Sequence, residues 1–109
     1  MSNLRGHKLM TKELIEKMPD LYSQEEKGLD AVVQVKFFSP YSNWTWYATE
    51  FDGKDVFFGY VEGFENELGT FSLSELDKVT TKMFGTEVPA VERDLYWTPR
   101  PLKEVMKVS

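Results

Sequence analysis

The chain has 109 residues, of which 41% are hydrophobic and 28% charged, the composition of an ordinary folded protein. This length predicts one domain over residues 1–109, because a chain of this size can bury one core but not two. The net charge of −5 disfavours nucleic acid as a partner, the absence of cysteine excludes disulfides and thiolate sites, and the single histidine, His7, excludes a site of several histidines.

A short helix is predicted to begin at Thr11, a suitable N-cap, and to end before Pro19. Apolar residues recur at every fourth position from Met10, so the helix should pack one apolar stripe on the core. Residues 20–30 are polar and predict a loop.

Strand-forming residues dominate the centre of the chain. The alternation of residues and the short turns, with Asp52 and Gly53 as the strongest hairpin signal, predict an antiparallel meander. Gly59, inside a strand, predicts a bulge or a close approach of two backbones. The four expected strands cover residues 31–38, 44–51, 55–63 and 68–72, and a short edge strand is expected at 91–97.

Helical signals return after the meander. The S-x-x-E pattern at Ser72 predicts a helix whose apolar face reaches Val79 and Met83, followed by a loop through Pro89. A last helix is predicted after residues 98–101. This order predicts an α+β fold: an antiparallel β-meander of about four strands plus a short edge strand, packed with three short helices.

Several distinctive segments follow one another along the chain: LYSQEEKGLDAVVQVKFFSPYSNWTWYATEFDG, FFG, ELGTFSLSEL and ERDLYW. With these segments the chain resembles a family catalogued as domain of unknown function 2958, from about Leu9 to Met106. Members of that family occur in bacteria, plasmids and phages, often among genes of mobile elements. The resemblance therefore implies a mobile-element setting, but no activity and no catalytic residues.

The segment SNWTWYATEFDG is the most unusual part of the sequence. In a regular strand, Trp44, Trp46 and Glu50 share one face and Tyr47 lies on the other. Either the tryptophans anchor the core and Glu50 pairs with Arg93, or the rings line a cleft that stacks a flat ligand or a partner's side chain. The candidate binding residues are Tyr22, Asn43, Trp44, Trp46, Tyr47, Glu50, Arg93 and Tyr96.

Two pairs of phenylalanines, at 37–38 and 57–58, place one ring on each face of their strands. A sheet with helices on one side only would leave half of these rings exposed. Either loops and the C-terminal helix cover the second face, or an exposed apolar patch marks a partner surface.

The charge is concentrated in the middle of the chain. Residues 19–92 hold fourteen acidic residues and five lysines, a net charge of −9, whereas residues 1–18 and 93–109 each carry +2. Most of the carboxylates fall in expected turns, where water would solvate them. Because the sequence holds no nucleophile, phosphate-loop or metal-loop motif, we predict no catalytic residue, metal or cofactor.

These features favour a non-catalytic accessory protein of a mobile genetic element that acts by protein–protein interaction. One form would be an acidic inhibitor of a host protein that handles nucleic acid or serves in defence. The alternative is a protein that binds or sequesters a small, nucleotide-like molecule in an aromatic cleft. A carboxylate-dependent enzyme and direct binding of nucleic acid have less support.

The first ten residues show neither the apolar stretch nor the cleavage site of a signal peptide. No stretch of about 20 apolar residues follows, as a membrane-spanning helix would need. The expected location is the cytoplasm of a bacterial host, without membrane association.

Overall fold

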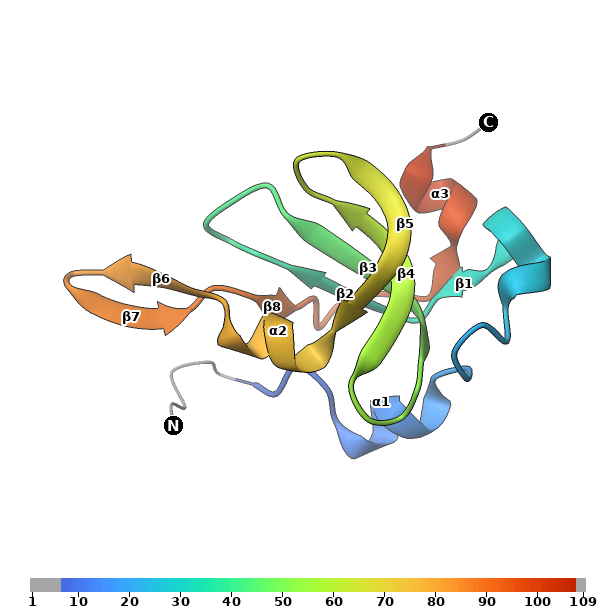
Figure 1. Cartoon of the computed structure of the whole chain (residues 1–109), viewed down its shortest axis with the longest axis horizontal. Coiled ribbons are helices and arrows are strands. Elements are labelled where there is room, and N and C mark those ends of the chain that lie inside the picture. Colours follow the sequence, from blue (N-terminus) through green and yellow to red (C-terminus); the bar gives the residue numbers. More distant parts are fainter. Residues whose placement is uncertain (1–6, 108–109) are drawn as a thin grey trace.

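The computed structural model describes residues 7–107. Its centre is a five-stranded antiparallel sheet with the strand order β5-β4-β3-β2-β8 (Figure 1). Four consecutive strands form the meander and a two-residue strand adds an edge, so the predicted α+β fold is confirmed. The strands are β2 (Val35–Phe38), β3 (Thr45–Phe51), β4 (Val56–Glu62), β5 (Asn66–Ser72) and β8 (Glu92–Arg93).

Short helices and two small sheets surround this centre. Thr11 and Ser72 cap two of the helices as predicted, because their hydroxyl oxygens accept the backbone N–H groups of Leu14 and Glu75. The helices are α1 (Lys12–Lys17), α2 (Leu73–Lys78), α3 (Leu102–Met106) and the 3₁₀ helix η1 (Glu25–Asp30). The small sheets pair β1 (Val32–Val33) with β9 (Arg100–Pro101) and β6 (Thr80–Met83) with β7 (Thr86–Pro89). No helix within residues 7–107 is long and apolar enough to cross a lipid bilayer.

The prediction of a helix reaching Met83 and a loop through Pro89 is wrong. Helix α2 ends at Lys78, and residues 80–89 form the β6–β7 hairpin, which projects from the body of the molecule (Figure 1). β-branched threonines at the start of β6 favour a strand. The turn residues Phe84 and Gly85 have φ values of 54° and 81°, and such positive values are typical of a tight hairpin turn.

The expected strand 31–38 breaks at Gln34. The burial of its side chains alternates as predicted, but the two halves belong to different sheets, because β1 pairs with β9 and β2 with β3. The backbone N–H of Gln34 still donates to the carbonyl oxygen of Ala48, at 2.9 Å. The strand therefore bends where it leaves the five-stranded sheet.

A bulge interrupts β3. The register with β4 shifts between Ala48 and Glu50, so Thr49 is an extra residue in the ladder. As a result Phe51 faces the main core with Trp46, and Glu50 faces the opposite side; the expected common face of Trp46 and Glu50 is wrong. A side chain at Gly59 would overlap the carbonyl oxygen of Tyr47, so the predicted close approach of two backbones is confirmed.

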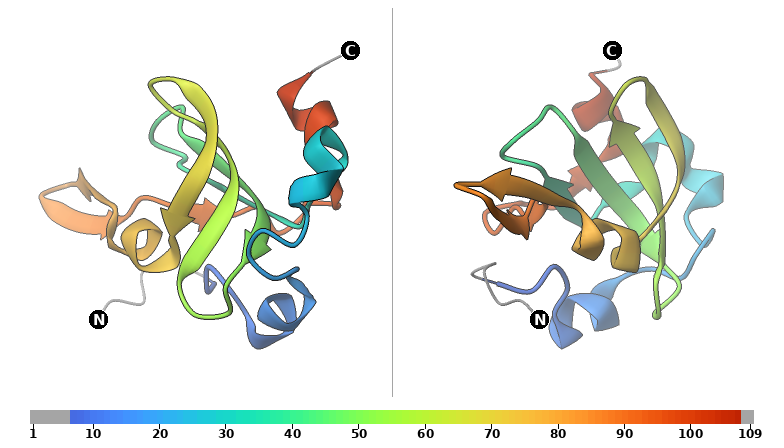
Figure 2. Two further views of the ribbon diagram at one scale, coloured as in Figure 1. Left: turned by 45° about the vertical axis from the view of Figure 1, so that its right-hand side comes forward. Right: turned by 60° about the vertical axis from the view of Figure 1, so that its left-hand side comes forward.

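The sheet is covered on both faces. Helices α1 and α2 pack on the face that holds the main core, whereas α3 packs on the other. Figure 2 shows η1 and α3 side by side at one end of the molecule. Of the two alternatives for the second face, the structure shows a covering, by the C-terminal helix at Tyr47 and Tyr60 and by Tyr22 of the loop before η1 beside the half-buried Phe58. The main core consists of Leu9, Met10, Met18, Val35, Phe37, Trp46, Ala48, Phe51, Phe57, Phe71, Leu76 and Val91. The second cluster consists of Ala31, Val33, Tyr47, Tyr60 and Leu102.

Candidate functional site

The structure distributes the eight candidate residues over several places. Trp44 and Trp46 line an apolar groove, and Tyr47 lies in the second cluster. Tyr22 and Glu50 meet at the far end of β3. The other three lie elsewhere: Arg93 in a polar pocket, and Asn43 and Tyr96 in exposed loops.

The apolar groove has a volume of about 290 Å³. The rings of Trp44 and Trp46 stack along it with centroids 5.7 Å apart. Trp46 is only 8% exposed and packs in the main core, whereas Trp44 is partly exposed. The core interpretation is therefore confirmed for Trp46, whereas binding of a ligand or partner in the groove stays a prediction. The lining residues are Ser39, Ser42, Trp44, Trp46 and Val79.

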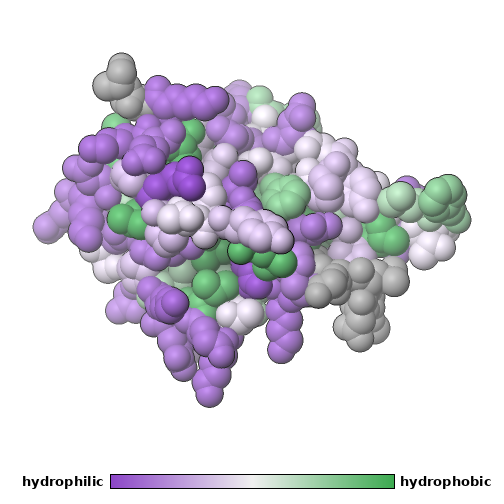
Figure 3. All heavy atoms as spheres, turned by 180° about the vertical axis from the view of Figure 1, so that it is seen from behind, coloured by the Kyte–Doolittle hydropathy of each residue, from purple (hydrophilic) through white to green (hydrophobic). Residues whose placement is uncertain are grey.

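One exposed aromatic ring extends this apolar region, and a second lies on the hairpin that follows Val79. Phe64, in the turn between β4 and β5, is 94% exposed and lies with its ring centroid 5.3 Å from that of Trp44. Phe84, at the tip of the β6–β7 hairpin, is fully exposed, and Figure 3 shows hydrophobic atoms on that projecting arm. We call Trp44, Trp46, Phe64, Val79 and Phe84 the groove surface.

Acidic residues dominate residues 62–92, the segment that carries Phe64, Val79 and Phe84 of the groove surface. Between Val61 and Glu92 the chain has seven carboxylates and two lysines, a net charge of −5. The carboxylates are Glu62, Glu65, Glu67, Glu75, Asp77, Glu87 and Glu92, and the lysines are Lys78 and Lys82.

Glu50 is buried and has a structural role. Its Oε1 accepts the backbone N–H of Tyr22 at 2.5 Å, and its Oε2 accepts that of Gln24 at 3.2 Å. These bonds hold the turn before η1, where Tyr22 has a φ of 66°. The predicted pairing of Glu50 with Arg93 is wrong, because the bulge turns Glu50 away from the main core and Arg93 lies opposite Phe37 in β8. Both oxygens of Glu50 are engaged inside the fold.

Tyr47 lies in an aromatic cluster on the second face. Its ring is 6.0 Å from that of Tyr60 and 5.8 Å from that of Trp97. Burial, together with the negative charge and hydrogen bond of Glu62, raises the pKa of Tyr47 to about 12. Lys36 lies 5.8 Å from the centroids of both Tyr47 and Trp97, and Arg100 lies 4.4 Å from that of Trp97.

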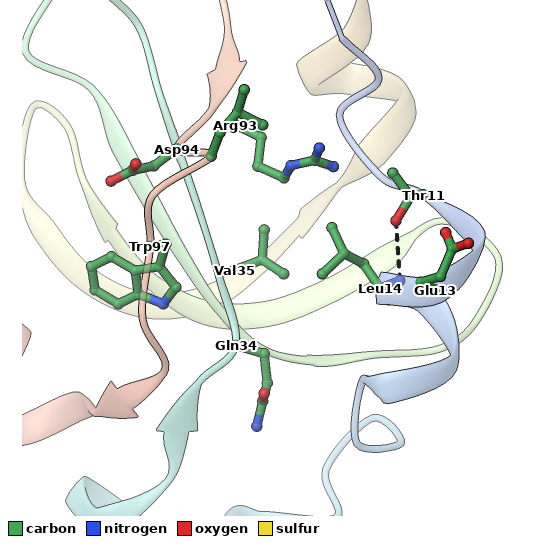
Figure 4. A pocket seen from close by; sticks show the side chains of 9 residues that line it. Thr11, Glu13, Leu14, Gln34, Val35, Arg93, Asp94 and Trp97 are labelled. Carbon is green, nitrogen blue, oxygen red and sulfur yellow. Dashed lines mark hydrogen bonds between the residues drawn. The ribbon is translucent and has the colours of Figure 1, made fainter.

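Arg93 lines a separate polar pocket of about 310 Å³, between α1, the start of β2 and the segment after β8 (Figure 4). Its Nη1 donates to the carbonyl oxygen of Leu9 at 3.3 Å, and its backbone N–H donates to Nε2 of His7 at 3.1 Å. Burial lowers the pKa of the Arg93 guanidinium. The lining residues are Thr11, Glu13, Leu14, Gln34, Val35, Arg93, Asp94, Leu95 and Trp97.

The family model described as "Protein of unknown function (DUF2958)" matches residues 9–108. The chain belongs to this family. The resemblance drawn from the distinctive segments is thereby confirmed over nearly the whole chain. No curated protein and no solved structure matches, so the function of this DUF2958 protein has to be inferred from its own groove and pocket.

Some residues of the groove surface and of the polar pocket in this DUF2958 protein were not predicted from the sequence. Phe64 and Phe84 each adjoin a glycine in a polar turn, a pattern that exposes a ring and could have marked them. Val79 and Trp97 gave no such signal, because their positions depend on how distant segments pack. Among residues 7–107, no group of three or more His, Asp or Glu side chains is placed to hold a metal ion.

Proposed function

We propose that this protein is a non-catalytic accessory protein that binds another protein through its groove surface. The observation that carries the proposal is an apolar groove open to solvent, extended by the exposed ring of Phe64 and accompanied by the exposed ring of Phe84 on the hairpin after Val79. Exposed apolar surface costs free energy in water and marks sites of association. Aromatic residues are also enriched at protein interfaces.

The size and lining of the groove favour a protein over a polar small molecule. A volume of about 290 Å³ accommodates one or two apolar side chains. Apart from two serine hydroxyls and the indole N–H groups of the tryptophans, the lining offers no polar group to orient a polar ligand, and no charged one. The occupant is therefore an apolar side chain that a partner protein inserts.

The net charge of residues 62–92 indicates what kind of protein surface would bind there. Residues 62–92 carry seven carboxylates and two lysines, and one of the carboxylates, Glu62, bonds Tyr47 on the second face. The net charge of −5 favours a partner whose surface is basic around its apolar anchor. Proteins that handle nucleic acid present basic surfaces to phosphates. The form we propose is an acidic inhibitor of such a host protein, or of a host defence protein. The mobile-element setting that the family resemblance implies supports this, and the proposed compartment is the bacterial cytoplasm.

The test compares three tagged chains: the wild type, the double variant Phe64→Ser/Phe84→Ser and the control Tyr96→Ser. Tyr96 is 92% exposed but lies outside the groove surface, so the control also removes an exposed ring. We expect the wild type and the control to capture one host protein in stoichiometric amount. With that protein purified, we expect the double variant to bind at least about tenfold more weakly and high salt to weaken the wild-type complex.

All three chains should fold equally well, because the substituted side chains are exposed. Circular dichroism and urea unfolding check this point. Absence of any stoichiometric partner at several salt concentrations, or equal binding by the double variant and the wild type, would contradict the proposal.

A further inference from the structure

The polar pocket around Arg93 is distinct from the groove surface and shares no residue with it. In Figure 4 the Arg93 side chain extends toward α1, the Trp97 ring lies on the opposite side and Val35 lies between them. The volume of about 310 Å³ is at the small end of ligand pockets, which run from about 300 to 1,000 Å³. It suits a ligand the size of a small metabolite.

The guanidinium of Arg93 gives the pocket a positive charge that would bind an anionic group of a ligand. Within residues 7–107 its guanidinium forms no ion pair, and its side-chain hydrogen bond goes to a neutral carbonyl, that of Leu9. A guanidinium has five N–H donors and matches a carboxylate with two parallel bonds. The pKa of Arg93 is lowered because burial removes water from the guanidinium. A bound anion would replace the interactions with that water.

The acidic residues of the pocket restrict the charge of that anion. Asp94 is already engaged, with Lys36 at 3.8 Å and with the backbone N–H of Tyr96. Glu13 lines the pocket and forms no ion pair within the described part of the chain. Two carboxylates repel a phosphate dianion, whereas a ligand with one negative and one positive group complements both Arg93 and Glu13.

The remaining walls are mainly apolar, apart from Thr11 and Gln34. Leu14, Val35 and Trp97 offer aliphatic and aromatic surface beside these charges. A hydrocarbon side chain placed there would leave water, which contributes favourably to binding. The side-chain amide of Gln34 adds one donor and one acceptor at the pocket.

We propose that this pocket binds a zwitterionic amino acid with an apolar side chain. Its carboxylate lies on Arg93, its ammonium group faces Glu13, and its side chain packs against Leu14, Val35 and Trp97. The proposal concerns a second site and does not depend on the proposed function of the groove surface.

The first test is a titration of the ¹⁵N-labelled full chain with L-leucine, followed by NMR. The indole N–H of Trp97, which donates to the carbonyl oxygen of Val33 at 3.0 Å, is the reporter. We expect a saturable shift with L-leucine. L-leucinamide, which lacks the carboxylate, and N-acetyl-L-leucine, which lacks the ammonium group, should each bind about tenfold more weakly or worse, because a charged partner is left unpaired.

Variants locate the site. Arg93→Gln should abolish the shift, whereas Arg100→Gln, which removes the same charge from the other arginine near Trp97, should leave the affinity within about twofold. Glu13→Gln alters an exposed residue of α1 and should not affect folding. It should weaken L-leucine binding and leave that of N-acetyl-L-leucine unchanged, so the proposal stays testable even if Arg93→Gln fails to fold.

Three results would overturn the proposal: no saturable shift at millimolar L-leucine, equal binding of L-leucinamide and L-leucine, or undiminished binding by Glu13→Gln. A Phe64→Ser/Phe84→Ser chain should bind L-leucine like the wild type, which keeps this test separate from that of the groove surface.

Discussion

The two faces of the five-stranded sheet are both covered, but by different means. The main core is apolar, and its phenylalanine rings contact one another directly. On the second face the rings of Tyr47 and Trp97 lie near charged side chains, and both form hydrogen bonds, Tyr47 with Glu62 and Trp97 with the carbonyl oxygen of Val33. The side chains of the first face are therefore held mainly by apolar burial, and those of the second by burial combined with specific hydrogen bonds.

This difference predicts which part of the molecule unfolds locally before the rest. Helices α1 and α2 cover the main core, whereas η1 and α3 cover the second face. Their ion pair, Asp30 with Lys103 at 2.8 Å, is exposed, and exposed pairs contribute little stability. We expect local opening at α3 before the sheet itself unfolds.

The largest expected effect is that of Phe57→Ala. Phe57 is fully buried, and its ring centroid lies 4.4 Å from that of Phe51 and 5.4 Å from that of Phe37. Its truncation should lower the free energy of unfolding by about 4 kcal/mol, measured by urea denaturation. Phe58→Ala, on the neighbouring and partly exposed position, is the control. An equal loss in both variants would show that the two faces contribute alike.

A smaller effect is expected on the second face for Trp97→Phe. The variant keeps an aromatic ring but loses the indole N–H that donates to the carbonyl oxygen of Val33. The expected loss is about 1 kcal/mol. Hydrogen exchange should quicken in α3 more than in β4. Uniform acceleration in both elements would contradict an independent opening of the second face.

The smallest effect is a pH dependence at Tyr47. Its pKa is about 12 in the folded chain against 10.0 for a free tyrosine, so the folded state holds the proton more tightly. The contribution of Tyr47 to the free energy of unfolding is complete below pH 10 and falls as the pH rises toward 12. Urea midpoints of the wild type and Tyr47→Phe should therefore converge or cross over this range. A constant difference between the two chains would count against burial of the hydroxyl.

The sequence predicted the elements whose signals are local. The caps at Thr11 and Ser72, the meander and the close approach at Gly59 all follow from residue types and spacing. Gly59 predicted a bulge or a close approach, and the bulge lies opposite it, but the regular alternation of β3 did not locate the extra residue at Thr49. That one residue moved Glu50 to the other face and removed its expected partner.

The candidate site was predicted only in part, for a related reason. Trp44 and Trp46 stand out because two tryptophans occur within three residues, so their common place in the groove could be anticipated. The polar pocket combines Glu13 with Arg93 and Trp97, which are about 80 residues away along the chain. Such a combination is created by packing and has no signature in the spacing of residues.

The turn of the β6–β7 hairpin has one further consequence. Phe84 adopts a φ of 54°, a left-handed conformation that asparagine or glycine reaches more readily. Its ring makes no compensating contact in the body of the molecule, since it is fully exposed. The isolated fold thus gains nothing from a phenylalanine here. What the hairpin provides is distance, because it holds the Phe84 side chain away from the five-stranded sheet, where the partner that we propose would contact it.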